Sequence, residues 1–209
     1  QLDNQAIFVH QYANGRLTLY KSELIGKEWT KPTPLKGIAE EESLADYNYP
    51  FMLTDGATLY YAANDEESLG GYDIYMTRYN ADDQEFLVPE NIGMPFNSTA
   101  NDYFFAIDEF HNLGWFATDR NMPNGKVCVY TFIPNETRQI YNEAETGMEA
   151  LRRYASIYSI RDTWTDKNRV DKALQNLKSL QMTKKAGNAA GSFEFVLNDK
   201  KTCNTEADF

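Results

Sequence analysis

The stretch DEESLGGYD contains four acidic residues around a pair of glycines. Their carboxylates are candidates for binding a ligand or a metal ion: Asp65, Glu66, Glu67 and Asp73. Carboxylate oxygens bind Ca²⁺, but a calcium site needs about six to eight converging oxygen ligands on a loop with a defined turn. This stretch lacks the ligand spacing of an EF-hand loop, so a solvated loop is the alternative. We take the four residues as candidate ligand-binding residues, and we predict no metal ion and no cofactor.

Acid–base catalysis has few candidates in this sequence. His10 and His111 are the two histidines that could act as general bases of the usual kind, and they fall in a predicted strand and a predicted turn. The sequence contains no Gly-x-Ser-x-Gly nucleophile elbow. We therefore predict no catalytic residue. A glycoside hydrolase stays open as the enzyme alternative, because acidic residues are frequent in the predicted turns and this reaction uses a pair of carboxylates.

Aromatic side chains are abundant, with 14 Tyr, 12 Phe and 3 Trp in 209 residues. Large rings suit the half-buried surface of a pleated sheet, so this composition favours a mainly β fold. We expect most of the aromatic residues within strands to pack in the core. Tyr47, Tyr49 and Tyr103 flank predicted loops, and they could instead line a groove for a glycan or a peptide.

The net charge of −11 bears on the class of partner. An acidic protein repels phosphate backbones and anionic lipid surfaces, so we predict that the chain binds no nucleic acid. No run of apolar residues approaches the roughly 18 that a membrane-spanning helix needs, so we also predict no membrane span.

The elements that must position these residues repeat along the chain. Tyr20, Tyr75 and Tyr130 recur at one constant interval, each within a strand-like run. Upstream of the second and third of these runs, LYYAAND (59–65) matches LGWFATD (113–119), which aligns Tyr61 with Trp115 and Asp65 with Asp119. Each unit reads as four short strands separated by turns, and units of about 40–55 residues with four strands are typical of β-propeller blades.

The first and third units are incomplete. A polar turn and an aromatic strand ending at a proline close the first two units, in Trp29-x-x-Pro32 and Phe86-x-x-Pro89. Proline cannot donate to a ladder and therefore suits an edge strand. The first unit lacks a first strand, and the third unit lacks this closing strand. We predict a partial β-propeller of about three four-stranded antiparallel blades over residues 1–136.

The stretch TDGATLYYAANDEESLGGYDIYMTRYN resembles the WD40-like β-propeller repeat of the TolB type. The residues that carry the resemblance are Asp55-Gly56, Tyr60-Tyr61, Asn64-Asp65, Gly70-Gly71 and Asp73-Ile74-Tyr75. It covers residues 6–133, and the third unit departs from it where Val127-Cys128-Val129-Tyr130 replaces Asp-Ile-Tyr. The resemblance implies a non-catalytic protein-interaction scaffold of the bacterial cell envelope, in the periplasm or at the outer membrane. Its implied partners are envelope proteins or peptidoglycan-associated proteins. The alternative is a carbohydrate-binding module or a glycoside hydrolase on a propeller.

The pattern changes to helix after the third unit. Residues 143–164 and 165–182 carry apolar residues at helical spacing, with Thr165 or Asp166 as the N-cap of the second helix. We assign residues 137–183 to a helical appendage, and residues 184–209 to a linker (184–191) and a lone strand (193–199). Three blades cannot close a propeller, since propellers have about 4–8 blades. We therefore expect the chain to be a piece of a longer protein, with its remaining blades supplied by its own chain or by another chain.

Overall fold

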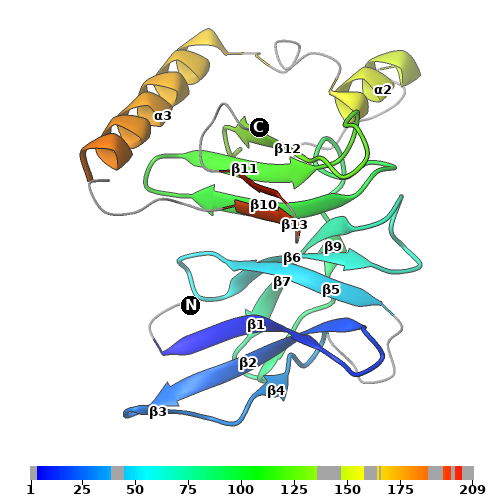
Figure 1. Ribbon diagram of the computed structural model, residues 1–209, viewed down its shortest axis with the longest axis vertical. Helices are drawn as coiled ribbons and strands as arrows, with labels where there is room; N and C mark the ends of the chain where they lie inside the picture. Colours follow the sequence, from blue (N-terminus) through cyan, green and yellow to red (C-terminus); the bar gives the residue numbers. More distant parts are fainter. Residues whose placement is uncertain are drawn as a thin grey trace.

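The computed structural model describes residues 4–38, 45–135, 147–157, 164, 166–187, 195–198 and 201–203. Three antiparallel sheets follow one another along the chain and are drawn in blue, cyan and green in Figure 1. Among the described residues, two helices and a two-stranded hairpin follow the third sheet. The prediction of a mainly β fold is confirmed.

Each sheet is built from strands that are consecutive in the chain. The first sheet contains β1 (Gln5–Gln11), β2 (Leu17–Ile25), β3 (Glu28–Trp29) and β4 (Thr33–Pro34). The second sheet contains β5 (Asp46–Met52), β6 (Thr58–Asn64), β7 (Asp73–Asn80), β8 (Glu85–Phe86) and β9 (Glu90–Asn91). The third sheet contains β10 (Asp102–Asp108), β11 (Leu113–Thr118) and β12 (Cys128–Phe132).

The strand register carries the tyrosine repeat. Tyr75 of β7 pairs with Tyr61 of β6, and Tyr130 of β12 pairs with Phe116 of β11. Tyr61 is therefore equivalent to Phe116, and the predicted alignment of Tyr61 with Trp115 is wrong by one residue. The predicted alignment follows residue similarity, and it uses an interval one residue shorter than the interval from Tyr75 to Tyr130. In the structure, the pairing of each of these strands with the strand that follows it sets the interval.

The outer strand of the first two sheets is broken into two short pieces. In the first sheet, β3 pairs with the end of β2 and β4 pairs with its middle. In the second sheet, β8 and β9 pair with β7 in the same way. The prediction of one strand ending at a proline is therefore wrong, because Pro32 and Pro89 interrupt the outer strand instead of ending it. The third sheet has three strands in the part of the chain that the structure describes.

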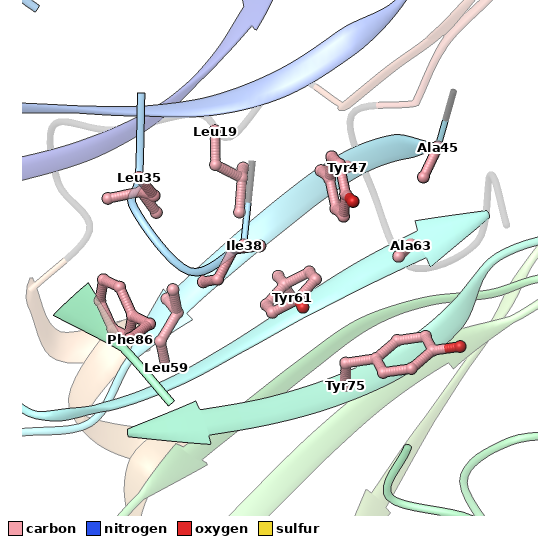
Figure 2. Packing of buried hydrophobic residues seen from close by; sticks show 10 residues of the cluster. All are labelled: Leu19, Leu35, Ile38, Ala45, Tyr47, Leu59, Tyr61, Ala63, Tyr75 and Phe86. Atoms are coloured by element: carbon pink, nitrogen blue, oxygen red, sulfur yellow. The ribbon is translucent and has the colours of Figure 1, made fainter. Parts of the chain in front are cut away.

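The second sheet packs on both of its neighbours. Residues of the first and second sheets form a first core, shown in Figure 2: Leu19, Leu35, Ile38, Ala45, Tyr47, Leu59, Tyr61, Ala63, Tyr75 and Phe86. Residues of the second and third sheets form a second core around Ile74, Phe105 and Phe116. Alternation along the strands divides the two cores, because neighbouring residues of a strand point to opposite faces of the sheet. Tyr61 accordingly lies in the first core, and Tyr60 packs against the second.

The two helices lie at opposite ends of the third sheet, α2 (Met148–Ser156) and α3 (Lys167–Gly187) (Figure 1). Asp166 caps α3, since its Oδ1 accepts from the backbone N–H groups of Asn168 and Arg169. The helix predicted over residues 143–164 is shorter in the structure, and part of that range lies outside the described residues. No helix among the described residues is long and apolar enough to cross a membrane.

The C-terminal segment differs from its prediction in two respects. Helix α3 continues to Gly187 and so covers the first half of the predicted linker, where lysine and alanine are good helix formers. The strand predicted to be lone is β13 (Phe195–Asn198), which pairs antiparallel with β14 (Lys201–Cys203). A hairpin with two residues between its strands is a common connection, and the polar sequence of β14 concealed it.

Candidate functional site

The predicted candidate Asp65 closes its own turn. Its Oδ1 accepts hydrogen bonds from the backbone N–H of Glu67 at 3.0 Å, the hydroxyl of Ser68 at 3.1 Å and the hydroxyl of Tyr75 at 2.9 Å. Aspartate commonly stabilises a turn by accepting from the backbone two residues on. Glu66 and Glu67 are exposed beside it. Asp65 is therefore occupied by structural contacts.

The predicted candidate Asp73 is fully buried at the start of β7. Its Oδ2 accepts from the backbone N–H of Leu69 at 3.1 Å and from the side-chain amide of Asn91 at 2.7 Å. Its Oδ1 has no partner among the described residues. Burial raises the pKa of Asp73, while these two hydrogen bonds lower it by less. Through these hydrogen bonds, Asp73 links two segments to the beginning of β7: the loop that contains Gly70 and Gly71, and strand β9.

The four predicted residues do not form one ligand-binding site that is open to solvent, because Asp73 is buried whereas Glu66 and Glu67 are exposed. Within the described residues, no group of three or more His, Cys, Asp or Glu side chains could hold a metal ion. The two histidines lie far apart in the sequence, His10 in β1 and His111 in the turn after β10. His10 packs against Tyr12 and Tyr20, and His111 Nδ1 lies 2.6 Å from Asp108 Oδ2 across the turn after β10.

Three tyrosines meet at the boundary between the second and third sheets, and we call them the tyrosine cluster: Tyr49, Tyr72 and Tyr103. Their ring centroids are 5.8–6.2 Å apart. Tyr49 is 40% exposed, and the other two rings are half-buried. Mutually packed rings form a firm amphipathic surface that loses little conformational entropy when a partner binds.

Two equivalent β-bulges direct these rings to one place. The register of β5 against β6 shifts between Asn48 and Phe51, and the register of β10 against β11 shifts between Asp102 and Phe104. Tyr49 and Tyr103 lie within these two shifts. Bulges re-aim side chains and are frequent beside functional sites. Tyr49 also has a φ of 51°, in the left-handed region that a bulky residue rarely adopts.

The glycine pair lets Tyr72 approach the third sheet. A Cβ on Gly70 would lie 2.4 Å from the backbone oxygen of Thr99, and one on Gly71 would lie 1.8 Å from Asn101 Oδ1. These two glycines therefore permit a close approach between neighbouring sheets. Across this contact, the backbone N–H of Tyr72 donates to Asn101 Oδ1 at 3.1 Å.

Asp119 holds Asn101 and Tyr103 in place. It accepts from the Asn101 backbone N–H and side-chain amide, each at 2.8 Å, and from the Tyr103 hydroxyl at 3.0 Å. Partial burial alone would raise the pKa of Asp119, but these hydrogen bonds together lower it, so the carboxylate stays ionised. Burial, followed by the contact with Asp119, raises the pKa of Tyr103 to about 12. The Tyr103 hydroxyl is therefore a neutral donor at neutral pH.

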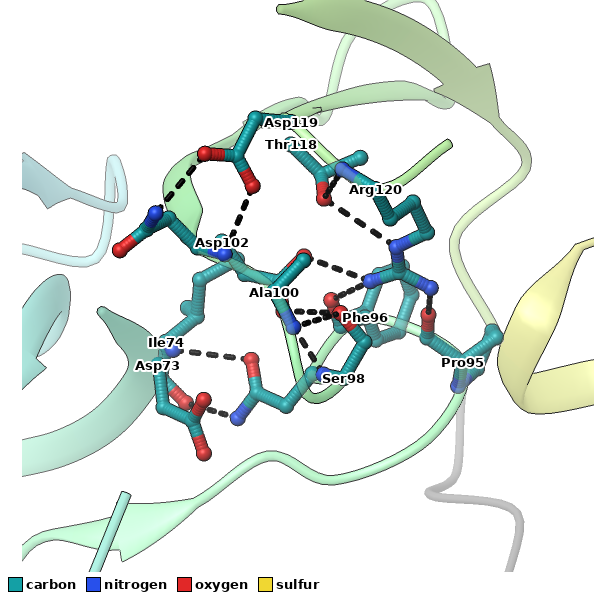
Figure 3. A network of polar contacts seen from close by, with 12 residues as sticks. Asp73, Ile74, Pro95, Phe96, Ser98, Ala100, Asp102, Thr118, Asp119 and Arg120 are labelled. Carbon is teal, nitrogen blue, oxygen red and sulfur yellow. Dashed lines mark hydrogen bonds and ion pairs between the residues drawn. The ribbon is translucent and has the colours of Figure 1, made fainter. Parts of the chain in front are cut away.

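Arg120 lies in a network of polar contacts that includes Asp102 and Thr118 (Figure 3). Its guanidinium donates to the hydroxyl of Thr118 at 3.2 Å and to Asp102 Oδ1 at 2.6 Å. It also donates to the backbone oxygens of Pro95 at 2.7 Å, Ala155 at 2.9 Å, and Phe96. Ala155 is one of the last residues of α2, where a cation stabilises the helix C-terminus. Arg120 thus joins β10, β11, the loop before β10 and helix α2.

Only part of this surface could be predicted from the sequence. Tyr49 and Tyr103 were expected beside a groove, and they lie in the cluster. Tyr47, expected with them, is only 9% exposed and packs in the first core. Tyr72 is not among the tyrosines predicted beside a groove, and the adjacent glycine pair is the sequence signal for its close approach.

A shallow depression of about 680 Å³ lies elsewhere, between the outer strands of the first two sheets. Lys21, Lys36, Glu85 and Phe86 are among the residues that line it, and it contains none of the four predicted carboxylates.

Comparison with protein-family models, curated proteins and solved structures found no match to this chain.

Proposed function

We propose that the chain is a non-catalytic protein-interaction scaffold, and that the tyrosine cluster is its contact surface. The observation that carries this proposal is the equivalent position of two bulges, one in β5 and one in β10. They direct Tyr49 and Tyr103 to one half-exposed surface. Tyrosine is enriched at protein interfaces because its ring buries a large apolar area while its hydroxyl keeps a hydrogen-bond partner.

We propose that the chain is non-catalytic because the carboxylates discussed above already make structural hydrogen bonds. A glycosidase needs one carboxyl group that donates a proton and a second that acts as nucleophile or base, both facing the substrate. Asp65 and Asp73 are engaged in turn and strand contacts, and Asp119 is engaged by Asn101 and Tyr103. These three carboxylates serve the fold in the described structure.

The architecture and the cell compartment complete the proposal. We interpret the three sheets as consecutive blades of a partial propeller of TolB-like repeats, with further blades supplied by its own chain or by another chain. The repeated strand register and the face-to-face packing support this interpretation. The bacterial envelope, periplasmic or at the outer membrane, is proposed from the resemblance of residues 54–80 to that repeat. Envelope proteins and peptidoglycan-associated proteins are then the partners to test.

Photo-crosslinking from the cluster tests the scaffold function. A benzoylphenylalanine in place of Tyr49 should form a discrete crosslinked product with an envelope protein in a Gram-negative envelope fraction. The same group in place of Val88, which is 87% exposed outside the cluster, is the matched control. Unlabelled chain should compete for the product, and a Tyr49→Ser/Tyr103→Ser variant should compete at least about tenfold less well. Equal products from both positions, or no product at Tyr49, would contradict the proposal.

Glycan binding is the second candidate, because tyrosine rings also stack on sugar faces. The structure favours binding over hydrolysis for this candidate, since the exposed Tyr49 lies beside half-buried rings. A glycan array read with the chain and with the Tyr49→Ser/Tyr103→Ser variant separates the two candidates. Specific glycan binding that the variant loses would replace the scaffold proposal by a carbohydrate-binding module. Glycoside turnover by the purified chain would replace it by a hydrolase.

A further inference from the structure

The outer edge of β12 differs from the equivalent edges of β2 and β7. In the first sheet β3 and β4 cover the edge of β2, and in the second sheet β8 and β9 cover the edge of β7. In the part of the chain that the structure describes, β12 pairs with β11 alone. An uncovered strand edge offers a row of backbone N–H and C=O groups to another extended chain.

Two backbone hydrogen bonds hold the first piece of the outer strand in equivalent positions. Thr30 N–H donates to the backbone oxygen of Glu23 at 2.8 Å, and Leu87 N–H donates to that of Arg78 at 2.9 Å. The acceptors Glu23 and Arg78 are separated by the interval of the tyrosine repeat. The residue at the same position of the third unit is Ile133, and its carbonyl is therefore the equivalent acceptor.

The second piece of the outer strand is held in the same way. Leu35 N–H donates to the backbone oxygen of Leu19, and Ile92 N–H donates to that of Ile74, both at 3.1 Å. Leu19 and Ile74 are also separated by the repeat interval, and the equivalent residue of the third unit is Val129. The two donors have the same spacing within both outer strands, so the first two sheets specify the spacing that an added strand needs.

The backbone N–H groups of the edge can be placed by the same comparison. Ile74 N–H points away from β6, because it donates to Asn97 Oδ1 at 2.8 Å. The equivalent N–H of Val129 therefore points outward, and strand alternation gives Thr131 the same direction. Val129 is 56% exposed, and Thr131 is exposed.

We propose that the outer edge of β12 is a docking site for an extended peptide of another protein chain, which adds antiparallel as a fourth strand. Strand addition of this kind takes its affinity from main-chain hydrogen bonds and its specificity from side-chain pockets. The site is separate from the tyrosine cluster, and the proposal does not depend on what the cluster binds.

The chain's own outer strands indicate the chemistry of the peptide. Residues 28–35 and 85–92 each place an aromatic residue beside the edge and a proline three positions later. The two outer strands differ in charge, since residues 85–92 contain two glutamates and no basic residue, whereas residues 27–37 contain three lysines and one glutamate, a net charge of +2. Of the two, the basic segment suits a chain of net charge −11. A net basic peptide with this aromatic and proline spacing is therefore the occupant that we infer.

One difference between the sheets limits the affinity expected. Ser22 and Thr77 donate their hydroxyls to the backbone oxygens of Thr30 and Leu87, at 2.7 and 2.6 Å. The equivalent residue in the third sheet is Phe132, which has no hydroxyl and packs against the second core. A peptide on β12 lacks this contact and binds reversibly.

A labelled peptide of residues 27–37 tests the site on the full 209-residue chain. We expect saturable binding in fluorescence anisotropy, and slower amide exchange at Val129 and Thr131 when the peptide is bound. Thr131→Pro should weaken binding at least about tenfold, because it removes an outward N–H that β11 does not use. Thr131→Ala keeps that N–H and is the matched control, which should bind like the unmodified chain. A peptide N-methylated at Thr30 and Leu35 should also lose at least about tenfold in affinity.

Each contrary result overturns the proposal. Binding that Thr131→Pro leaves unchanged would place the peptide elsewhere, for example on β2. Absence of saturable binding, or amides of Val129 and Thr131 already protected in the free chain, would show that the edge is not open to a peptide. Amide exchange in β10 and β11 shows whether Thr131→Pro folds. If it does not, the N-methylated peptide decides the question on the unmodified chain.

Discussion

Arg120 shows how one buried side chain can join four segments. All of the donors of its guanidinium face oxygen atoms, and its partner Asp102 is itself fully buried. The carboxylate of Asp102 also accepts from the backbone N–H and hydroxyl of Ser98. A buried ion pair is a weak source of net stability, but removing one member leaves the other charge uncompensated.

Replacement of Arg120 should therefore be costly. We expect Arg120→Met to lower the free energy of unfolding by about 3–5 kcal/mol, because Asp102 and three backbone oxygens lose a donor. Arg152→Met, at an exposed position of α2, is the matched control and should change it by less than about 0.5 kcal/mol. Urea unfolding followed by tyrosine and tryptophan fluorescence measures both. Similar midpoints for the two variants would show that Arg120 does not hold these segments together.

Asp73 should give the stability a distinct pH dependence. Its pKa in the folded state lies above the ordinary value of 3.8, chiefly because the carboxyl is buried. Well below pH 3.8 the group is protonated in both states and contributes no pH dependence. As the pH rises from 3.8 through the folded pKa, the unfolded state ionises first, so the free energy of unfolding falls and then levels off.

Asp73→Asn removes this dependence, because an amide does not ionise. We expect the free energy of unfolding of the variant, relative to the unmodified chain, to rise with pH across that window and to be constant above it. Unfolding at several pH values between about 3 and 7 measures the difference. Asp82→Asn, which removes one carboxylate at an exposed position in the turn after β7, is the matched control. A difference that falls as the pH rises would be the opposite of the sign worked out for Asp73.

At the scale of strands and loops, contacts between neighbouring sheets repeat along with the strands themselves. Asp46 Oδ1 accepts from the backbone N–H of Leu17 at 2.8 Å, and Asn101 Oδ1 accepts from that of Tyr72 at 3.1 Å. Both acceptors lie at the beginning of the first strand of a sheet, and both donors lie at the beginning of an inner strand of the preceding sheet. Each side chain therefore ties one sheet to the next.

Removal of these ties should destabilise the chain by unequal amounts. Asp46→Ala leaves the N–H of Leu17 without its partner, and should cost about 1–2 kcal/mol. Asn101→Ala should cost more, because Asn101 also donates its side-chain amide to Asp119. Thermal unfolding of both variants, with Asn124→Ala in the exposed turn before β12 as the control, measures the order. The Asn101 variant should also weaken the crosslink from Tyr49, and an equal cost for Asp46 and Asn101 would contradict the second role of Asn101.

The strands could be predicted from the sequence because their signals are local. Asp55-Gly56 specifies a turn, and the structure shows Asp55 accepting from the backbone N–H groups of Ala57 and Thr58 while Gly56 has a φ of 68°. Alternation predicted the strands on either side of that turn. The repeat of Tyr20, Tyr75 and Tyr130 also predicted equivalent places in the three sheets.

The site could not be predicted in the same way because its contacts are not local. Arg120 takes its partners from Pro95, Phe96 and Ala155, which lie 24 to 35 positions away. Asp65 and Asp73 are acidic residues beside glycines, which made them candidates for ligand binding. A carboxylate that binds a ligand and one that accepts hydrogen bonds from a loop have the same sequence signal, however. The bulges that direct Tyr49 and Tyr103 could not be predicted from the alternation, because a single extra residue is defined only by the register against the partner strand.

At the scale of the whole molecule, the second sheet belongs to both cores. Leu59 packs in the first core and is fully buried, while Phe105 packs in the second core and is 5% exposed. Figure 1 shows the second sheet between the other two. In such a serial arrangement each unit contacts only its neighbours, and stability is close to a sum of unit and interface contributions. The first and third sheets can then open separately, while β6 and β7 stay covered on at least one face.

Amide hydrogen exchange should reveal this order. We expect the slowest exchange in β6 and β7, since opening either outer sheet exposes only one of their faces. Leu59→Ala leaves a cavity in the first core, at a cost of about 2–5 kcal/mol, and should accelerate exchange in β1 and β2 more than in β10 and β11. Phe105→Ala should do the reverse, because its ring packs against Phe96, Phe132 and Tyr60 of the second core. The two variants control for each other. Uniform acceleration over all three sheets in both would show one cooperative unit, in which case the two cores would not act as separate interfaces.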